Sequence, residues 1–143
     1  MESNQVMKQI KEKYQQVEIL DNHLLVPETD IKAVMKELRD AYGYNVLSNE
    51  TAVDYQEYFE VIYNICRVPE GDMINIKVKI DREKAEIPSV VDIWPSAGWQ
   101  EREIFDLLGI RFTDHPDMRR ILLEDDFEGH PLRRDFKWVG GRD

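Results

Sequence analysis

The run from Met73 to Asp81 constrains the fold more than any other feature of the sequence. Apolar and polar residues alternate through it, in the order Ile74, Asn75, Ile76, Lys77, Val78, Lys79 and Ile80. A period of two places the apolar side chains on one face of a β-strand and the polar ones on the other. Because parallel strands are usually covered on both faces, this pattern indicates an antiparallel sheet with one face in water.

Further strands are predicted on both sides of this run. Residues 57–68 repeat the apolar alternation, and the turn sequence Pro69-Glu70-Gly71-Asp72 joins them to it, which predicts a hairpin. Weaker β patterns cover residues 17–20 and 23–26 around Asp21-Asn22, residues 44–55 with a break near Ser48-Asn49, and residues 88–94, which fit a short strand or a helical turn.

Three segments have helical periodicity. They are residues 3–15, residues 30–42 ending before Gly43, and residues 97–108 between a capping Ser96 and Gly109. After Phe112 the periodicity fades. The predicted fold class is α+β, a small antiparallel-rich sheet with helices packed on one side of it, followed by an extended tail. We expect a core domain over residues 1–112 and a tail over residues 113–143.

Charge and cysteine content exclude several classes of function. The 143 residues contain 19 Lys and Arg against 29 Asp and Glu, a net charge of -10. Such a surface repels nucleic-acid phosphates and anionic lipids. Cys66 is the single cysteine, so an internal disulfide or an iron–sulfur cluster held by this chain is excluded. With no signal peptide and no run of about 18 apolar residues, the chain is expected to be a soluble cytoplasmic domain.

The basic residues of the tail differ in kind from those of the core. Residues 101–143 contain seven Arg and one Lys, whereas residues 1–100 contain three Arg and eight Lys. Arg suits buried or interfacial carboxylates, since its planar guanidinium binds them in a bidentate manner. The tail is therefore predicted to be held by a protein surface. That surface could belong to another protein, which the composition favours, or to the chain itself.

The helix predicted over residues 97–108 is rich in charge. Glu101 and Glu103 could be a general acid and base, but their spacing places them on different faces, so a solvated or partner-facing helix is favoured. Arg102 and Asp106 stand at i and i+4 and are expected to pair along the surface.

Two His-Pro segments follow, at His115 and His130, each with an Arg pair a few residues later. The pairs are Arg119-Arg120 and Arg133-Arg134. The histidines and nearby Asp residues could hold a metal, although the spacing matches no close zinc pattern. The alternative is that proline directs the chain while each histidine fills a half-buried polar position.

Three collinear stretches carry a resemblance to a known family. They are WQEREIFDLLGI from Trp99, HPDMRRILL from His115 and EGHPLRRDF from Glu128. Together they resemble the signature of the 30 kDa subunit of respiratory complex I, also called the C subunit of NADH dehydrogenase. The family includes the homologous subunits of energy-converting membrane-bound nickel–iron hydrogenases and related ferredoxin-dependent complexes. The chain departs from the family pattern at Glu124, Phe127 and Lys137.

The resemblance implies a non-catalytic structural subunit of the hydrophilic arm of an ion-translocating redox enzyme. Such a subunit braces the homologue of the hydrogenase large subunit (the 49 kDa-type subunit). It binds no cofactor, and iron–sulfur clusters lie in partner subunits. It sits on the cytoplasmic side of the membrane, held there by its partners. The matching positions imply partner-binding side chains at Glu101, Arg102, Glu103, Asp106, His115, Arg119, Arg120, His130, Arg133, Arg134, Asp135 and Phe136.

Other functions remain open. One, which the resemblance also implies, is the equivalent subunit of a membrane-bound hydrogenase or ferredoxin-dependent complex. A second is a free-standing metal-dependent hydrolase that uses His115, His130 and neighbouring acids. A third is a regulatory binding domain.

The tail after Phe112 is expected to be mobile in the isolated chain and ordered in a complex.

Overall fold

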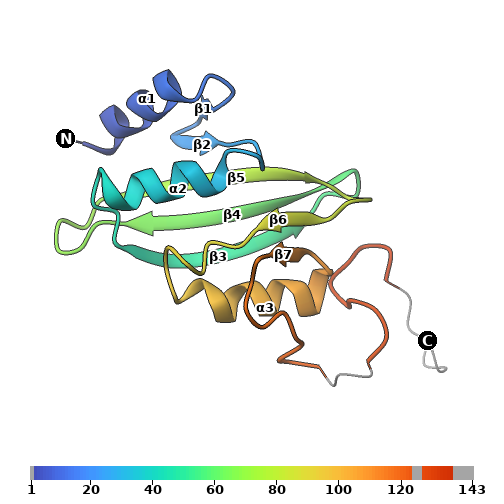
Figure 1. Cartoon of the computed structure of the whole chain (residues 1–143). Coiled ribbons are helices and arrows are strands. Elements are labelled where there is room, and N and C mark those ends of the chain that lie inside the picture. The colour runs from blue at the N-terminus through green and yellow to red at the C-terminus, as the bar shows by residue number, and fades with distance from the viewer. Residues whose placement is uncertain (1, 124–126, 137–143) are drawn as a thin grey trace.

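The computed structural model describes residues 2–123 and 127–136 (Figure 1). A five-stranded sheet forms the centre, in the order β1-β2-β5-β4-β3. Its strands are β1 (Glu18–Leu20), β2 (His23–Leu25), β3 (Val46–Asp54), β4 (Tyr58–Cys66) and β5 (Met73–Asp81). Neighbouring strands are antiparallel except β2 and β5, which are parallel. The antiparallel-rich α+β fold predicted from the sequence is confirmed, with one parallel pair within this sheet.

The turns and register follow the sequence signals. Asp21 and Asn22 connect β1 to β2 with φ of 46° and 69°, a left-handed conformation that Asp and Asn tolerate. Strands β4 and β5 form the predicted hairpin. The pairing of β3 with β4 shifts between Leu47 and Asn49, at the break that the sequence indicates. This β-bulge turns Glu50 onto the core face of the sheet, opposite Tyr63.

One face of the sheet carries the core. The alternating residues of β4 and β5 on that face are fully or almost fully buried: Phe59, Val61, Tyr63, Ile65, Ile74, Ile76, Val78 and Ile80. Burying an aliphatic or aromatic side chain of this size contributes about 1.5–3 kcal/mol, so the alternation accounts for much of the stability of the sheet. On the opposite face, Asn75 and Lys79 are exposed, as predicted.

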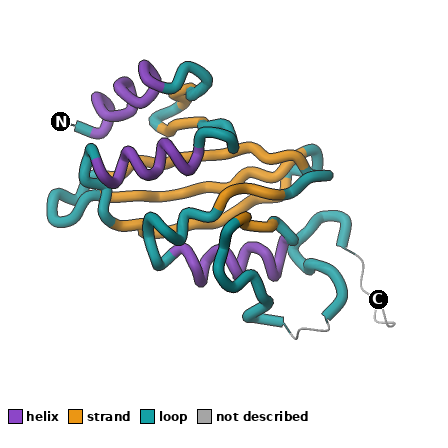
Figure 2. The backbone as a smooth tube through the Cα atoms, viewed as in Figure 1, coloured by secondary structure: helices purple, strands orange, loops and turns teal. Residues whose placement is uncertain are grey.

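The three helices are α1 (Ser3–Lys13), α2 (Ile31–Asp40) and α3 (Ala97–Leu108). Helix α2 lies over the sheet, α1 lies beside β1 and β2, and α3 runs along β3 (Figures 1 and 2). Gly43 and Gly109 follow α2 and α3 with φ of 81° and 79°, as expected of glycine after a helix. The predicted Ser96 cap is wrong in one respect. Its hydroxyl donates to the Leu47 carbonyl (3.3 Å) and does not accept a capping hydrogen bond from the N–H groups at the start of α3.

A second, two-stranded sheet flanks α3. It pairs β6 (Glu86–Pro88) with β7 (Arg111–Thr113) in parallel, which anchors the chain before and after α3. The segment after β6 forms a turn at Val90, whose carbonyl accepts from the N–H groups of Ile93 and Trp94. Beyond β7, residues 114–123 and 127–136 contain no helix or strand, and they wrap around α3 (Figure 2).

Candidate functional site

The side chain of Asp106, on α3, organises the segment that follows β7. It is fully buried. Its Oδ2 accepts hydrogen bonds from the backbone N–H groups of Ile121, Leu122 and Leu123 at 3.2, 2.7 and 3.0 Å. Its Oδ1 accepts from Nη1 of Arg120 at 2.7 Å. Burial alone would raise the pKa of Asp106, but Arg120 and the three N–H groups lower it, so the group stays a carboxylate.

The C-terminal end of α3 is capped by the same segment. The last carbonyls of a helix have no partner within it. Here the Asp106 carbonyl accepts from Nη1 of Arg120 and from Nδ1 of His130, both at 3.0 Å. The Leu107 carbonyl accepts from the Leu132 N–H at 2.9 Å. Because a helix C-terminus carries partial negative charge, the guanidinium of Arg120 is also electrostatically favoured there.

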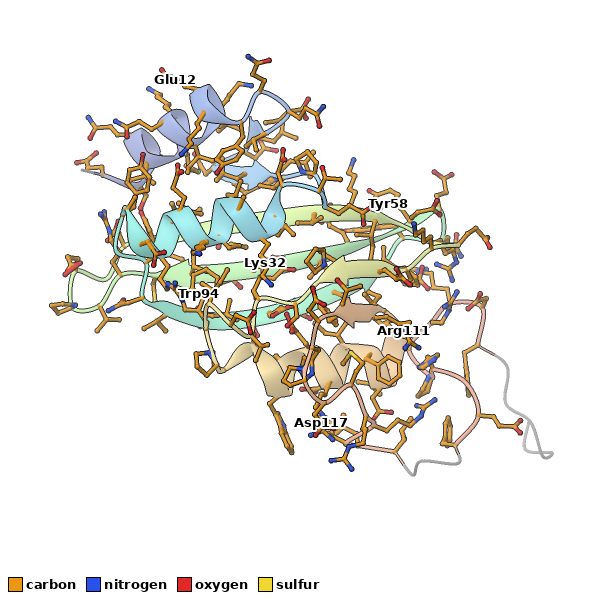
Figure 3. The ribbon with its side chains drawn as sticks, in the orientation of Figure 1. Glu12, Lys32, Tyr58, Trp94, Arg111 and Asp117 are labelled. Carbon is orange, nitrogen blue, oxygen red and sulfur yellow. The ribbon has the colours of Figure 1, made fainter. Side chains whose placement is uncertain are left out.

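His115 lies near the N-terminal end of α3. Its Nε2 is 2.9 Å from the carbonyl of Gly98, and its Nδ1 is 3.0 Å from the backbone nitrogen of Asp117. A carbonyl only accepts and a backbone N–H only donates, so Nε2 carries the proton and Nδ1 is an acceptor. Figure 3 labels Asp117 in the loop that passes below α3.

The two predicted His-Pro segments therefore contact opposite ends of α3 and do not form one site. His130 packs so closely on Gly109 that a Cβ there would lie 2.7 Å from the imidazole. Across residues 2–123 and 127–136, no group of three or more His, Cys, Asp or Glu side chains is arranged to hold a metal. Both histidines are half-buried, as the structural alternative predicted.

The predicted surface pair of Arg102 with Asp106 is wrong, because Asp106 points into the segment that it binds. Arg102 instead donates from Nε to the Arg119 carbonyl (3.0 Å) and from Nη2 to the Arg120 carbonyl (3.1 Å). Its guanidinium also lies over the Trp99 ring, 5.5 Å from the centroid. Arg102 and Asp106 thus hold the same segment separately, from neighbouring turns of α3.

The arginine pairs also bind groups of this chain. Arg120 forms an ion pair with Asp106. Nε of Arg134 donates to the Asp54 carbonyl (2.7 Å), and its backbone N–H donates to the Asp54 carboxylate (2.8 Å). Arg133 pairs with Asp135 at 2.9 Å. Arg119 pairs with Asp117, and its side chain remains 73% exposed. Arg120 and Arg134 therefore donate hydrogen bonds within the domain, and the contact of their side chains with a partner stays a prediction.

Phe136 also packs within the chain. Its ring stacks on that of Phe127, with centroids 6.2 Å apart. The same ring lies 2.9 Å from the position that a Cβ of Gly129 would occupy, which requires glycine there. The segment from His130 to Phe136 is thus held at several points along its length.

The prediction that Glu101 and Glu103 lie on different faces of α3 is correct, but Glu101 does not face water. Glu103 is exposed, whereas Glu101 is fully buried. Glu101 accepts from the Ser89 hydroxyl (2.5 Å) and the Val90 N–H (3.1 Å). Burial raises the pKa of Glu101, and these donors oppose that rise. The helix is therefore solvated on one side only.

Glu50 is a buried acidic residue that the sequence patterns did not single out. Among the described residues, its buried carboxyl oxygens and the nearby buried hydroxyl of Tyr63 have no hydrogen-bond partner. Burial, followed by the neighbouring Glu101 carboxyl, raises the pKa of Glu50 well above its ordinary value. Glu50 therefore favours its protonated form more strongly than an exposed glutamate does. The position of Glu50 on the core side of the predicted strand could have indicated that its carboxyl group is buried.

The surface of this junction is apolar and aromatic. Trp99, Leu122 and Leu132 are 62%, 55% and 60% exposed. Buried ion pairs and hydrogen bonds hold the segment on α3, and these large apolar side chains face outward. Such an arrangement is typical of a domain that presents a fixed surface to other proteins. No helix in the described part of the chain is long and apolar enough to cross a membrane.

Sequence comparisons define the family. The model for the 30 Kd subunit of respiratory-chain NADH dehydrogenase matches residues 24–142. The NADH-quinone oxidoreductase C subunit of Moorella thermoacetica is 48% identical over 116 residues, which span 80% of this chain and 78% of that protein. The corresponding protein of Geobacter sulfurreducens is 35% identical over 150 residues, spanning 97% and 92%. The chain belongs to the family of the 30 Kd subunit of respiratory-chain NADH dehydrogenase, as its signature predicts.

Solved structures agree with the fold. A trypsin-resistant fragment of Nqo5 superposes with a TM-score of 0.71 at 30% identity, covering 82% of this chain and 99% of the fragment. A chain of the membrane-bound sulfane sulfur reductase, an archaeal respiratory membrane complex, superposes with a TM-score of 0.78 at 28% identity. It covers 95% of this chain and 86% of the other. Relatives of this chain therefore occur in more than one kind of respiratory complex.

Proposed function

We propose that this chain is a non-catalytic structural subunit of the hydrophilic arm of a complex I-like, ion-translocating redox enzyme. In that role it braces the 49 kDa-type subunit, the homologue of the hydrogenase large subunit. The chain binds no cofactor itself, and iron–sulfur clusters lie in its partners. It is held on the cytoplasmic side of the membrane through those partners. The family membership supports this proposal most broadly.

The observation that carries the structural role is the set of contacts to Asp106. One buried carboxylate orders three successive residues, Ile121 to Leu123, and an arginine beside them. Ordering backbone costs about 1–2 kcal/mol per residue, so a segment ordered before binding loses less entropy when a partner binds. The chemistry of the junction is used to fix its shape, which suits a brace better than a reaction centre.

Affinity purification from native membranes tests this function. A tag on the full chain should recover a large-subunit homologue, iron–sulfur subunits and integral membrane proteins in constant ratio. The chain expressed alone should be colourless and free of stoichiometric iron, nickel or zinc. Recovery of the tagged chain without those partners, or a metal that survives mild chelation of the free chain, would contradict the proposal.

A second candidate is the equivalent subunit of a membrane-bound hydrogenase or ferredoxin-dependent complex. The superposition on a chain of the sulfane sulfur reductase supports this second candidate function. The donor and acceptor sites would lie in other subunits, so the same purification distinguishes the two. Oxidation of NADH by the recovered complex supports the first assignment. Oxidation of ferredoxin with reduction of protons or sulfur compounds supports the second.

A further inference from the structure

Strand β3 is the long edge strand of the main sheet. The other edge, β1, has three residues, whereas β3 has nine. In an antiparallel pair, alternate residues direct their N–H and C=O groups toward the partner strand or away from it. The Glu50 N–H donates to Oε1 of Gln100 (2.6 Å), outside the ladder with β4. Glu50, Ala52 and Asp54 therefore direct their backbone groups to the open edge.

The chain covers this edge at its two ends. Near its start, Gln100 binds the Glu50 N–H, and Ser96 donates to the Leu47 carbonyl. Near its end, Arg134 donates to the Asp54 carbonyl. Between these points, no hydrogen bond from described residues reaches the outward N–H and C=O of Ala52. Natural sheets usually protect a long edge, so a gap flanked by two protected ends is unusual.

The gap opens into a groove of about 290 Å³ between residues 49–52 of β3 and α3, and Figure 1 shows these two elements running side by side. Leu107, Leu108 and Leu132 form its apolar end. Glu103, one helical turn before Leu107, also lines the groove and is exposed. Within the described residues, no Lys or Arg lines this groove.

These features specify the chemistry of an occupant. An extended peptide supplies the N–H and C=O that pair with Ala52. An apolar side chain on it fits against the three leucines, and a Lys or Arg fits against Glu103. One helical turn rises about 5.4 Å, and residues two apart in a strand are about 6.8 Å apart. The basic and apolar residues of the occupant should therefore be separated by one residue.

We infer that the groove between β3 and α3 binds an extended segment of a partner subunit, which adds a short strand at Ala52 and carries a basic residue two positions from an apolar one. The inference rests on the proposed function and specifies where one partner binds. It differs from the Asp106 junction, which fixes the chain's own segment. The acidic rim of the groove and the net charge of -10 both favour a cationic occupant.

The test uses the tagged full chain and its native partners. Ala52→Pro removes the outward N–H and leaves the ladder groups of β3 in place, because proline is tolerated on edge strands. Val53→Ala is its matched control on the same strand, since Val53 pairs with Glu60 of β4 and does not line the groove. Glu103→Arg reverses the rim charge without entering the core, and Glu12→Arg makes the same change on the exposed surface of α1.

We expect Ala52→Pro and Glu103→Arg each to reduce recovery of partner subunits by at least about fivefold, a loss equivalent to roughly 1 kcal/mol. The two controls should match the wild type, and the melting temperature of the free chains should stay near the wild-type value. In the wild-type complex, exchange of the Ala52 amide should be at least about tenfold slower than in the free chain.

Three results would overturn the inference. The first is full recovery of partners by both groove variants. The second is fast exchange at Ala52 in the complex. The third is slow exchange at Ala52 in the free chain, which would mean that part of the chain itself fills the groove. If the wild-type chain recovers no partners at all, the proposed function fails together with the inference. If partners are recovered equally by the groove variants, only the inference fails.

Discussion

At the scale of single residues, two buried carboxyl groups in the α3 region have opposite electrostatic situations. Asp106 has four donors and a lowered pKa, whereas Glu50 lacks a donor among the described residues and has a raised pKa. The first stabilises the fold as a charged group and the second as a neutral one. Substitution of each by its amide should therefore have opposite consequences.

Replacing Asp106 by Asn should strongly destabilise the free chain. The amide loses the charge that Arg120 neutralises and directs an NH₂ group toward other donors. Removing one member of a buried ion pair costs about 3–5 kcal/mol. Urea denaturation of Asp106→Asn against the wild type measures this difference. Asp117→Asn, which alters an exposed pair with Arg119, is the control and should leave the unfolding curve almost unchanged.

Replacing Glu50 by Gln should change the pH dependence of stability. The folded state keeps a proton on Glu50 at pH values where the unfolded chain releases it, so stability falls as pH rises. That fall begins near the ordinary value of 4.5 and continues up to the raised pKa of the folded state. Within this window, the free energy of unfolding of Glu50→Gln minus that of the wild type should increase by up to about 1.4 kcal/mol per pH unit.

Unfolding measured from pH 4 to pH 8 tests the Glu50 prediction. Glu103→Gln, an exposed change on the same helix as Glu101, should run parallel to the wild type. Parallel curves for Glu50→Gln as well would show that Glu50 is ionised in the fold.

On the acid side, Arg82 and the backbone of Arg134 and Gln56 overcome burial and lower the pKa of Asp54 to about 2. Its contribution should therefore be lost as the pH falls below about 4 toward that value.

At the scale of elements, the sequence predicts what is local and misses what is not. The alternation from Ile74 to Ile80 is sufficient to place β5 and its buried face, because side-chain direction in a strand is a local property. The burial of Asp106 could not be predicted in this way, since its donors lie 14 to 17 residues later in the chain. A local rule offered only Arg102, four residues earlier, which faces elsewhere.

Contacts between residues far apart in the sequence also explain the other differences between the predicted and the observed structure. Glu101 is buried because Ser89 and Val90, 12 and 11 residues earlier, supply its donors. The parallel pair of β6 and β7 joins two three-residue segments with α3 between them, which are too short for a strand pattern to reveal. The resemblance identified the family correctly. It did not show that Arg120 and Arg134 would bind within the chain, because a family signature does not distinguish internal contacts from intersubunit ones.

The end of α3 yields a prediction at the scale of elements. Gly109→Ala should destabilise the chain more than Gly71→Ala. Both glycines have positive φ, so each substitution introduces backbone strain of roughly 1–2 kcal/mol. At Gly71 a Cβ meets no atom within 4 Å, whereas at Gly109 it meets the imidazole of His130 at 2.7 Å. The difference between the two free energies of unfolding isolates the packing of His130 on the helix end.

Combining Gly109→Ala with His130→Ala checks that interpretation of the helix end. The double variant should recover part of the loss, since the clash disappears while the backbone strain remains. Equal destabilisation by Gly109→Ala and Gly71→Ala would contradict a close contact between His130 and α3.

At the scale of the whole molecule, the contacts to α3 alter one expectation about the tail. The composition alone favours a segment that is mobile until a partner orders it. In the structure, residues 114–123 and 127–136 bind Asp106, Gly98, Asp54 and the carbonyls at the end of α3. These contacts favour a segment that the domain orders before assembly. Residues 124–126 and 137–143 of the predicted tail lie outside the described residues.

Backbone hydrogen exchange of the Ile121, Leu122 and Leu123 amides, in the free chain and in the purified complex, tests this account most directly. All three donate to one buried carboxylate oxygen. We predict slow exchange in both states and fast exchange in the free Asp106→Asn variant, whose β4 amides should stay protected. Fast exchange of these three amides in the free wild-type chain, with protection only in the complex, would contradict the account and show that the partner, not Asp106, orders the segment.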